Sequence, residues 1–162
     1  FRSENLPKVY ADGSDLTARA HMMSAAAMGA TAFQKGLGAI HSLSHPLGAL
    51  YDTHHGMTNA VFMPYVLAFN RSAIEERIER AAAYIGIEGG FDGFAKAVLD
   101  LRKTLNVPHT LPEFIKDFAP DDARKNLIAD MAIVDPTAGG NPIELTKQGA
   151  LKLLDDAING NL

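Results

Sequence analysis

Apolar positions recur every three or four residues along most of the chain, which is the spacing of helices that bury one face. In residues 72–84 apolar side chains mark one face and charged side chains the other. Residues 91–105 repeat the pattern at intervals of 4, 3 and 4, with Phe94, Val98, Leu101 and Leu105. No segment alternates with the period of two that strands show. The pattern predicts an all-α fold.

Further helices are expected over residues 14–33, 39–50, 58–69, 113–118, 120–133 and 147–158. Ser14 is a plausible N-cap, and Pro64 is expected to kink or restart its helix. The segment 14–33 is rich in alanine, which predicts a tightly packed central helix. Residues 1–13 contain Pro7 and Gly13 and are predicted to be an extended lead-in. The result is about seven helices with short connections.

The composition fits one globular domain: 162 residues, 47% hydrophobic and 21% charged. The chain has no cysteine, which excludes disulfides and thiolate metal sites and fits a cytoplasmic protein. Its formal charge of −4 offers no basic surface for nucleic acid, and no apolar run is long enough to span a membrane. The glycines follow no strand, so they do not form a nucleotide-binding fingerprint.

Histidine is concentrated in one short segment. Four of the six histidines lie between residues 41 and 55. His41 and His45 are four residues apart, which places them on one face of a helix, and a chain reversal after Pro46 can return His55 to that face. Neutral imidazoles suit Fe²⁺ and Zn²⁺, so all three are candidate metal ligands. The alternative is a set of exposed or structurally paired histidines.

A zincin-type hydrolase also carries two histidines on one helix, but it needs a glutamate directly after the first. Ser42 occupies that position, and no carboxylate adjoins the pair. His54 is expected at the surface or behind the ligands. His21 and His109 are isolated, and we assign neither a function.

Residues 32–60 resemble the histidine signature of the iron-containing (group III) alcohol dehydrogenases. The matching elements are Gly-Leu-Gly at 36–38, His-x-x-x-His-Pro-x-Gly at 41–48, Tyr-Asp at 51–52, His-Gly at 55–56 and Asn-Ala at 59–60. The resemblance extends to the alanine-rich helix and to residues 135–146. One departure is His54, where many members of the family have proline.

The resemblance implies the C-terminal helical domain of the dehydroquinate synthase-like, iron alcohol dehydrogenase type. Family members bind a divalent metal through one aspartate and three histidines, of which the last two match His41 and His55. The residue that matches His45 lies beside the nicotinamide and the substrate, so His45 is the candidate catalytic and cofactor-binding residue. The implied cofactors are Fe²⁺, or alternatively Zn²⁺, and NAD or NADP.

The family's first two ligands form an Asp-x-x-x-His element about sixty residues before the position of His41. No such element occurs in residues 1–40. Residues 1–162 are therefore expected to form an incomplete C-terminal helical metal-binding domain. The N-terminal α/β domain that binds NAD(P) and the first metal ligands would lie outside it, and the isolated chain is expected to be inactive.

The expected function is the interconversion of an alcohol and an aldehyde or ketone by hydride transfer. Two alternatives stay open: a maleylacetate reductase-like, metal-independent oxidoreductase, and a stand-alone helical binding module that keeps a vestigial signature. The expected partners are an alcohol or aldehyde and further copies of the chain in a homo-oligomer. If an α/β domain is missing, an apolar face should be exposed around Leu37, Leu43, Leu47 and Tyr51.

Overall fold

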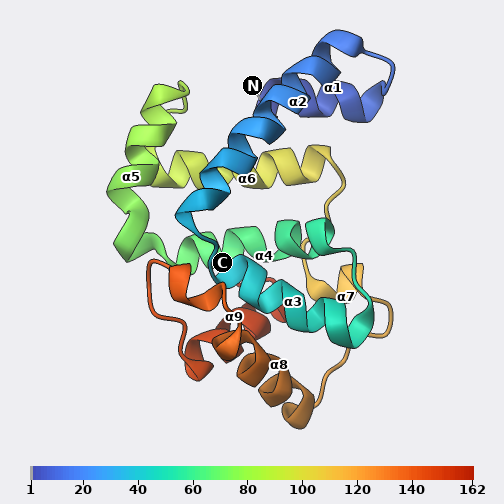
Figure 1. The fold of residues 1–162 in the computed structure, drawn as a ribbon, viewed down its shortest axis with the longest axis vertical. Coiled ribbons are helices and arrows are strands. Elements are labelled where there is room, and N and C mark those ends of the chain that lie inside the picture. Colours follow the sequence, from blue (N-terminus) through green and yellow to red (C-terminus); the bar gives the residue numbers. More distant parts are fainter. Residues whose placement is uncertain (1) are drawn as a thin grey trace.

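The computed structural model describes residues 2–162, and the side chains from residue 4 onward. Within that part the chain forms helices and no strand, which confirms the all-α prediction (Figure 1). The α-helices are α1 (Arg2–Ala11), α2 (Leu16–Ala32), α3 (Ala39–Tyr51), α4 (His55–Phe69), α5 (Arg71–Tyr84), α6 (Gly90–Thr104), α7 (Leu111–Phe114), α8 (Asp122–Val134) and α9 (Lys147–Asn159). Two short 3₁₀ turns, η1 (Phe33–Lys35) and η2 (Ala138–Gly140), precede α3 and follow α8.

The hydrophobic core lies between α3, α4, α8 and α9, in the lower half of Figure 1. Its largest fully buried aliphatic side chains include Leu43 and Leu47 from α3 and Leu153 and Leu154 from α9. Helices α5 and α6 pack on each other beside this core, and α6 also contacts α4. None of the helices in residues 2–162 combines the length and the apolar character that a bilayer-spanning segment needs.

The turn between α3 and α4 is short and tightly specified. Asp52 ends α3 in the left-handed conformation, with φ of 51°, and its N–H donates to the carbonyl oxygen of Gly48 at 3.0 Å. His54 then caps α4, because its Nδ1 accepts from the N–H of Met57 at 3.2 Å. This reversal places the start of α4 alongside α3.

Two asparagines attach the start of α3 to distant parts of the chain. The side chains of Asn70 and Asn141 exchange hydrogen bonds of 2.9 and 2.8 Å. The Oδ1 atom of Asn141 also accepts from the N–H of Ala39 at 3.1 Å. Nearby, a Cβ at Gly140 would overlap the carbonyl oxygen of Leu37, so the two backbones can approach this closely only with glycine. The segment 138–146 is thereby packed against the N-terminus of α3.

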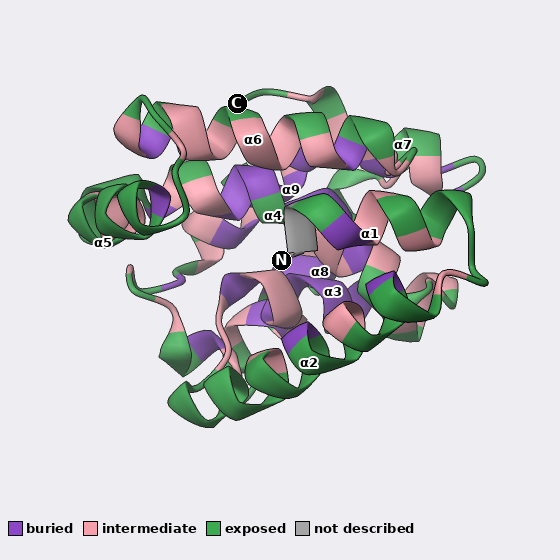
Figure 2. Cartoon of the chain, turned by 90° about the horizontal axis from the view of Figure 1, so that it is seen from above, coloured by how far each residue is buried: buried purple, intermediate pink, exposed green. Residues whose placement is uncertain are grey.

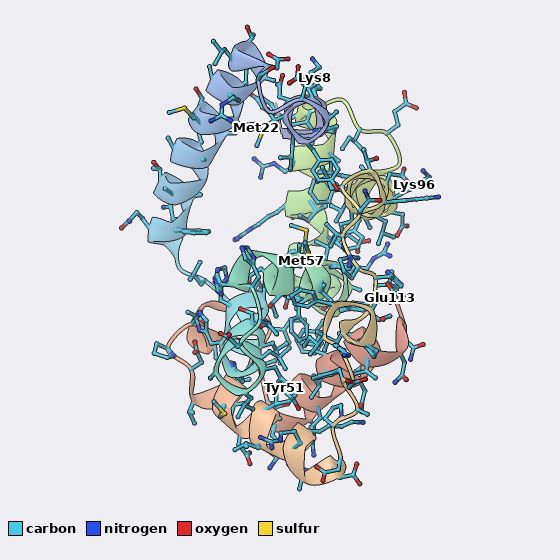
Figure 3. The ribbon with its side chains drawn as sticks, turned by 90° about the vertical axis from the view of Figure 1, so that its right-hand side faces the viewer. Lys8, Met22, Tyr51, Met57, Lys96 and Glu113 are labelled. Atoms are coloured by element: carbon cyan, nitrogen blue, oxygen red, sulfur yellow. The ribbon has the colours of Figure 1, made fainter. Side chains whose placement is uncertain are left out.

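Two of the sequence predictions for the N-terminal part are wrong. Residues 2–11 form α1 rather than an extended lead-in, because the helix packs against α2 and α6 despite Pro7. The alanine-rich α2 is not central, since only Ala18 and Ala25 are buried along it (Figure 2). In Figure 3, Lys8 and Met22 lie at the end of the molecule opposite Tyr51, which shows that α1 and α2 project away from the core.

The prediction of an exposed apolar face around α3 is also wrong. Leu43 and Leu47 are fully buried, and Leu37 and Tyr51 are half-buried. The reason is geometric: residues two apart on a helix point about 200° apart, so Leu43 lies opposite the face of His41 and His45. The exposed large apolar side chains of the N-terminal part instead include Leu16, Met23 and Met28 of α2, at 78%, 75% and 72% exposure.

Several helix boundaries differ from the prediction. The N-cap of α2 is Asp15 rather than Ser14, since the Asp15 carboxylate accepts from the N–H of Ala18 at 2.9 Å. Helix α4 begins at His55 and continues through Pro64 without restarting. Helix α7 spans residues 111–114 instead of 113–118. It begins earlier because the Thr110 hydroxyl oxygen accepts from the N–H of Glu113 and caps the helix there.

The asparagine pair predicts a stability effect. Asn141→Ala removes the acceptor of the Ala39 N–H and leaves the buried amide of Asn70 without its partner. The free energy of unfolding should therefore fall by about 2–3 kcal/mol. The control is Asn159→Ala, which removes one exposed hydrogen bond to a helix carbonyl and should change stability by less than about 0.5 kcal/mol. Urea denaturation followed by circular dichroism measures both. Equal effects would show that the pair does not stabilise the fold.

Candidate metal centre

The fold brings three of the histidines together. His41 and His45 lie on the exposed side of α3, and His55 occupies the first turn of α4. The ring centroid of His55 is 5.2 Å from that of His41 and 5.4 Å from that of His45, and the rings of His41 and His45 are 6.0 Å apart. The expectation that the chain reversal returns His55 to the face of His41 is therefore met by the structure.

Asn59, one turn further along α4, joins the two histidines predicted as ligands. Its Nδ2 atom lies 3.3 Å from Nε2 of His41 and 3.0 Å from Nε2 of His55. Because an amide nitrogen only donates, both Nε2 atoms act as acceptors in this arrangement. The Oδ1 atom of Asn59 is buried and has no hydrogen-bond partner among the described residues.

A contact with Ser44 orients the ring of His55. The Ser44 hydroxyl donates to the carbonyl oxygen of His41 at 3.1 Å and lies 3.4 Å from Nδ1 of His55. Since the hydroxyl hydrogen is directed at the carbonyl, the Nδ1–H of His55 donates to Ser44 and the Nε2 lone pair stays free. This is the tautomer in which Nε2 can bind a metal.

These features fit His41 and His55 as two ligands of one metal site. Both Nε2 atoms accept from the same Asn59 nitrogen, so the two lone pairs are directed at one point. Within residues 2–162, however, no group of three or more histidine, cysteine or carboxylate side chains is arranged to hold a cation. The assignment of His41 and His55 as two ligands of an incomplete site stays a prediction.

His45 is held in a different way. Its Nδ1 atom lies 2.8 Å from Oδ2 of Asp135, which follows α8. The other carboxylate oxygen of Asp135 accepts from the backbone N–H of Thr137 at 2.8 Å and from the Thr137 hydroxyl at 2.6 Å. The His45 side chain is 41% exposed, whereas that of Asp135 is only 13% exposed. His45 is thus oriented by a sheltered carboxylate and presents its other edge to the open side.

The surroundings shift two pKa values at this site. Partial burial lowers the pKa of His41, and the neighbouring imidazoles of His55 and His45 lower it further, which favours the neutral ring. Burial alone would raise the pKa of Asp135, but the hydrogen bonds from Thr137 and His45 outweigh it and hold the pKa below its usual value. The carboxylate is therefore ionised opposite His45.

A pocket of about 630 Å³ adjoins the histidines. Its walls come from α2, from the segment 36–41 and from residues 140–142, and His41 lies at its edge. Most of the lining side chains are small or apolar, including Ala26, Ala30 and Ile40. An open pocket of this kind can accommodate an apolar molecule or side chain next to His41.

The sequence identified His41, His45 and His55, and the structure brings these three together. His54 caps α4 at the surface, as expected, while His21 lies in α2 and His109 in the loop before α7. Two contacts were missed. Asn59 was part of the signature without a role, and Asp135 lies 90 residues from His45, where no local pattern could connect them.

The comparisons with known proteins agree with this helical, histidine-bearing arrangement. The sequence profile "Fe-containing alcohol dehydrogenase family, C-terminal" matches residues 3–158. The chain therefore belongs to the iron-containing alcohol dehydrogenase family and corresponds to the C-terminal domain of its members.

Individual relatives show the same coverage. The chain is 39% identical to the 4-hydroxybutyrate dehydrogenase of Cupriavidus necator, over 91% of this chain and 40% of that protein. It is 32% identical to the NADPH-dependent butanol dehydrogenase of Clostridium saccharobutylicum, over 94% of this chain and again 40% of the relative. The crystal structure of a 1,3-propanediol oxidoreductase superposes with a TM-score of 0.87 at 29% identity, covering 96% of this chain and 42% of that one. The chain thus spans about two-fifths of the relatives' length.

The position of Asn59 predicts a gain of metal affinity. Asn59→Asp would place an anionic oxygen next to both Nε2 atoms, so the chain should bind Co²⁺ at least about tenfold more tightly. The matched control is Asn59→Ala, which removes the amide without adding a ligand. Co²⁺ titration followed by visible absorption compares the two. If the aspartate variant binds no more tightly than the alanine variant, His41 and His55 do not face a common cation position.

Proposed function

We propose that the chain is the C-terminal helical part of a metal-dependent, NAD(P)-linked alcohol dehydrogenase that interconverts an alcohol and its aldehyde or ketone. The observation that carries this proposal is the approach of His41 Nε2 and His55 Nε2 to one atom of Asn59, with the ring of His45 stacked on that of His55. Family membership supports the same reaction class, because relatives named as dehydrogenases of 4-hydroxybutyrate and butanol share this region.

In this proposal His41 and His55 hold a divalent cation, Fe²⁺ in the first place and Zn²⁺ as the alternative. When bound, the cation would polarise the alcohol oxygen and the nicotinamide would take the hydride. His45 moves the proton of the alcohol, since its ring stacks on that of His55 and its side chain reaches solvent. The adjoining pocket presents apolar walls beside His41.

The remaining parts of the site lie outside these 162 residues in the proposal. The relatives are more than twice as long as the matched region, which leaves room for a nucleotide-binding domain and for further metal ligands. Two imidazoles without other ligands hold a cation weakly, so the chain alone is expected to be inactive. The homo-oligomer expected from the sequence stays a prediction.

Metal binding tests the ligand assignment. The chain should bind Zn²⁺ with a dissociation constant above the micromolar range, and His41→Ala or His55→Ala should reduce the affinity at least about tenfold. His109→Ala removes an exposed loop histidine and should have no effect. Isothermal titration calorimetry measures all four proteins. Submicromolar binding of one Zn²⁺ by the unmodified chain would contradict the assignment of a half-site.

Activity tests the reaction. This chain can replace the matching 40% of the Cupriavidus necator 4-hydroxybutyrate dehydrogenase, so that the relative supplies the rest of the enzyme. The chimaera should reduce NAD(P)⁺ in the presence of a short alcohol, lose this activity with a chelator and regain it with Fe²⁺. His41→Ala and His55→Ala should each lower kcat at least about 100-fold. A folded chimaera that stays active with both histidines replaced would refute the proposed role.

A further inference from the structure

The contact between His45 and Asp135 has the geometry of a catalytic imidazole and its orienting carboxylate. The 2.8 Å bond uses Nδ1 of His45, and Nε2 makes no hydrogen bond to another described residue. The carboxylate is mostly buried while the imidazole is partly exposed, at 13% and 41%. A surface ion pair that only joins two helices has no need for this asymmetry, because both partners can then remain hydrated.

Asp135 is itself fixed by its neighbours in sequence. Pro136 disfavours the helical conformation at the preceding residue, and Asp135 accordingly ends α8 in an extended conformation with φ of −63° and ψ of 134°. The carboxylate then turns back to accept both donors of Thr137 through Oδ1. Only Oδ2 remains for His45, so the carboxylate cannot rotate without losing the two bonds to Thr137.

We propose that Asp135 and Thr137 form a positioning unit that keeps the proton of neutral His45 on Nδ1, so that Nε2 is the atom that accepts the substrate proton. The role of Nε2 as acceptor of the substrate proton rests on the proposed function. The assignment of the tautomer does not depend on that function. An ionised carboxylate can only accept a hydrogen bond, which requires the hydrogen on Nδ1. Neither Asp135 nor Thr137 touches the substrate in this arrangement; both act through the imidazole.

The substitution Asp135→Asn makes a sharp test because the backbone N–H of Thr137 cannot change its role. The asparagine must turn its oxygen toward that N–H and therefore directs its amide group at Nδ1 of His45. Nδ1 then becomes an acceptor and the proton moves to Nε2. In a serine-protease triad, a change of this kind lowers kcat about 10⁴-fold by stabilising the wrong tautomer.

The tautomer is measured by long-range ¹H–¹⁵N correlation spectra of the chain labelled with ¹⁵N-histidine, at pH about 8.5, where an ordinary imidazole is neutral. The unmodified chain should show His45 with a protonated Nδ1 and a bare Nε2, and Asp135→Asn should invert the two shifts. Thr137→Val keeps the backbone donor and should preserve the native tautomer. The matched control, Asp130→Asn on α8, removes an exposed ion pair with Lys147 of α9 and should change nothing at His45.

Circular dichroism establishes that each variant is folded. A His45 that carries its proton on Nε2 in the unmodified chain, or that keeps its tautomer in the folded Asp135→Asn variant, would overturn the inference. In the active chimaera, Asp135→Asn should lower kcat about 10²–10⁴-fold with a much smaller change in KM. An unaffected kcat would also overturn it. A folded chimaera that is inactive with native Asp135 refutes the proposed function instead, and the spectra then decide the tautomer independently.

Discussion

The hydrogen bonds between Asn70 and Asn141 are the contact on which the geometry of the histidine site depends. They join residues 71 positions apart, and Asn141 then binds the N–H of Ala39, 102 positions away. Ala39 begins α3, and Asn70 directly follows α4. His41 lies two residues after Ala39, and His55 lies at the other end of α4, about four helical turns before Asn70, so these contacts position the two helices as rigid bodies. The amide pair therefore fixes the ends of the two histidine-bearing helices that lie away from their connecting turn.

The rotation of α3 about its own axis is set by apolar burial. Leu43 and Leu47 are fully buried, and each contributes about 1.5–3 kcal/mol relative to an exposed position. His41 and His45 lie on the opposite side of the helix by the geometry of its 3.6-residue turn. Turning α3 to bury the imidazoles would expose both leucines and leave polar nitrogens in the core without partners. Burial of the two leucines therefore turns the side of α3 that carries the histidines away from the core.

Local patterns predicted what depends on local spacing. The helical fold and the common face of His41 and His45 follow from residues three or four apart, and the structure confirms both. The position of α2 could not be predicted in this way, because alanine favours a helix without indicating what the helix packs against. The contact of Asp135 with His45 spans 90 residues and depends on how α8 packs on α3. Such contacts follow from tertiary packing and leave no periodic signal in the sequence.

The segment 135–146 combines these effects at one site. At its start Asp135 holds the ring of His45, and six residues later Asn141 holds the first residue of α3. Two attachments on one helix fix both its position and the direction of a side chain along it. Asn59 and Ser44 do the same for His41 and His55 from within α3 and α4. These contacts thus order all three imidazoles. Because the entropy of ordering these side chains is lost on folding, little of it would remain to be lost when a ligand binds them.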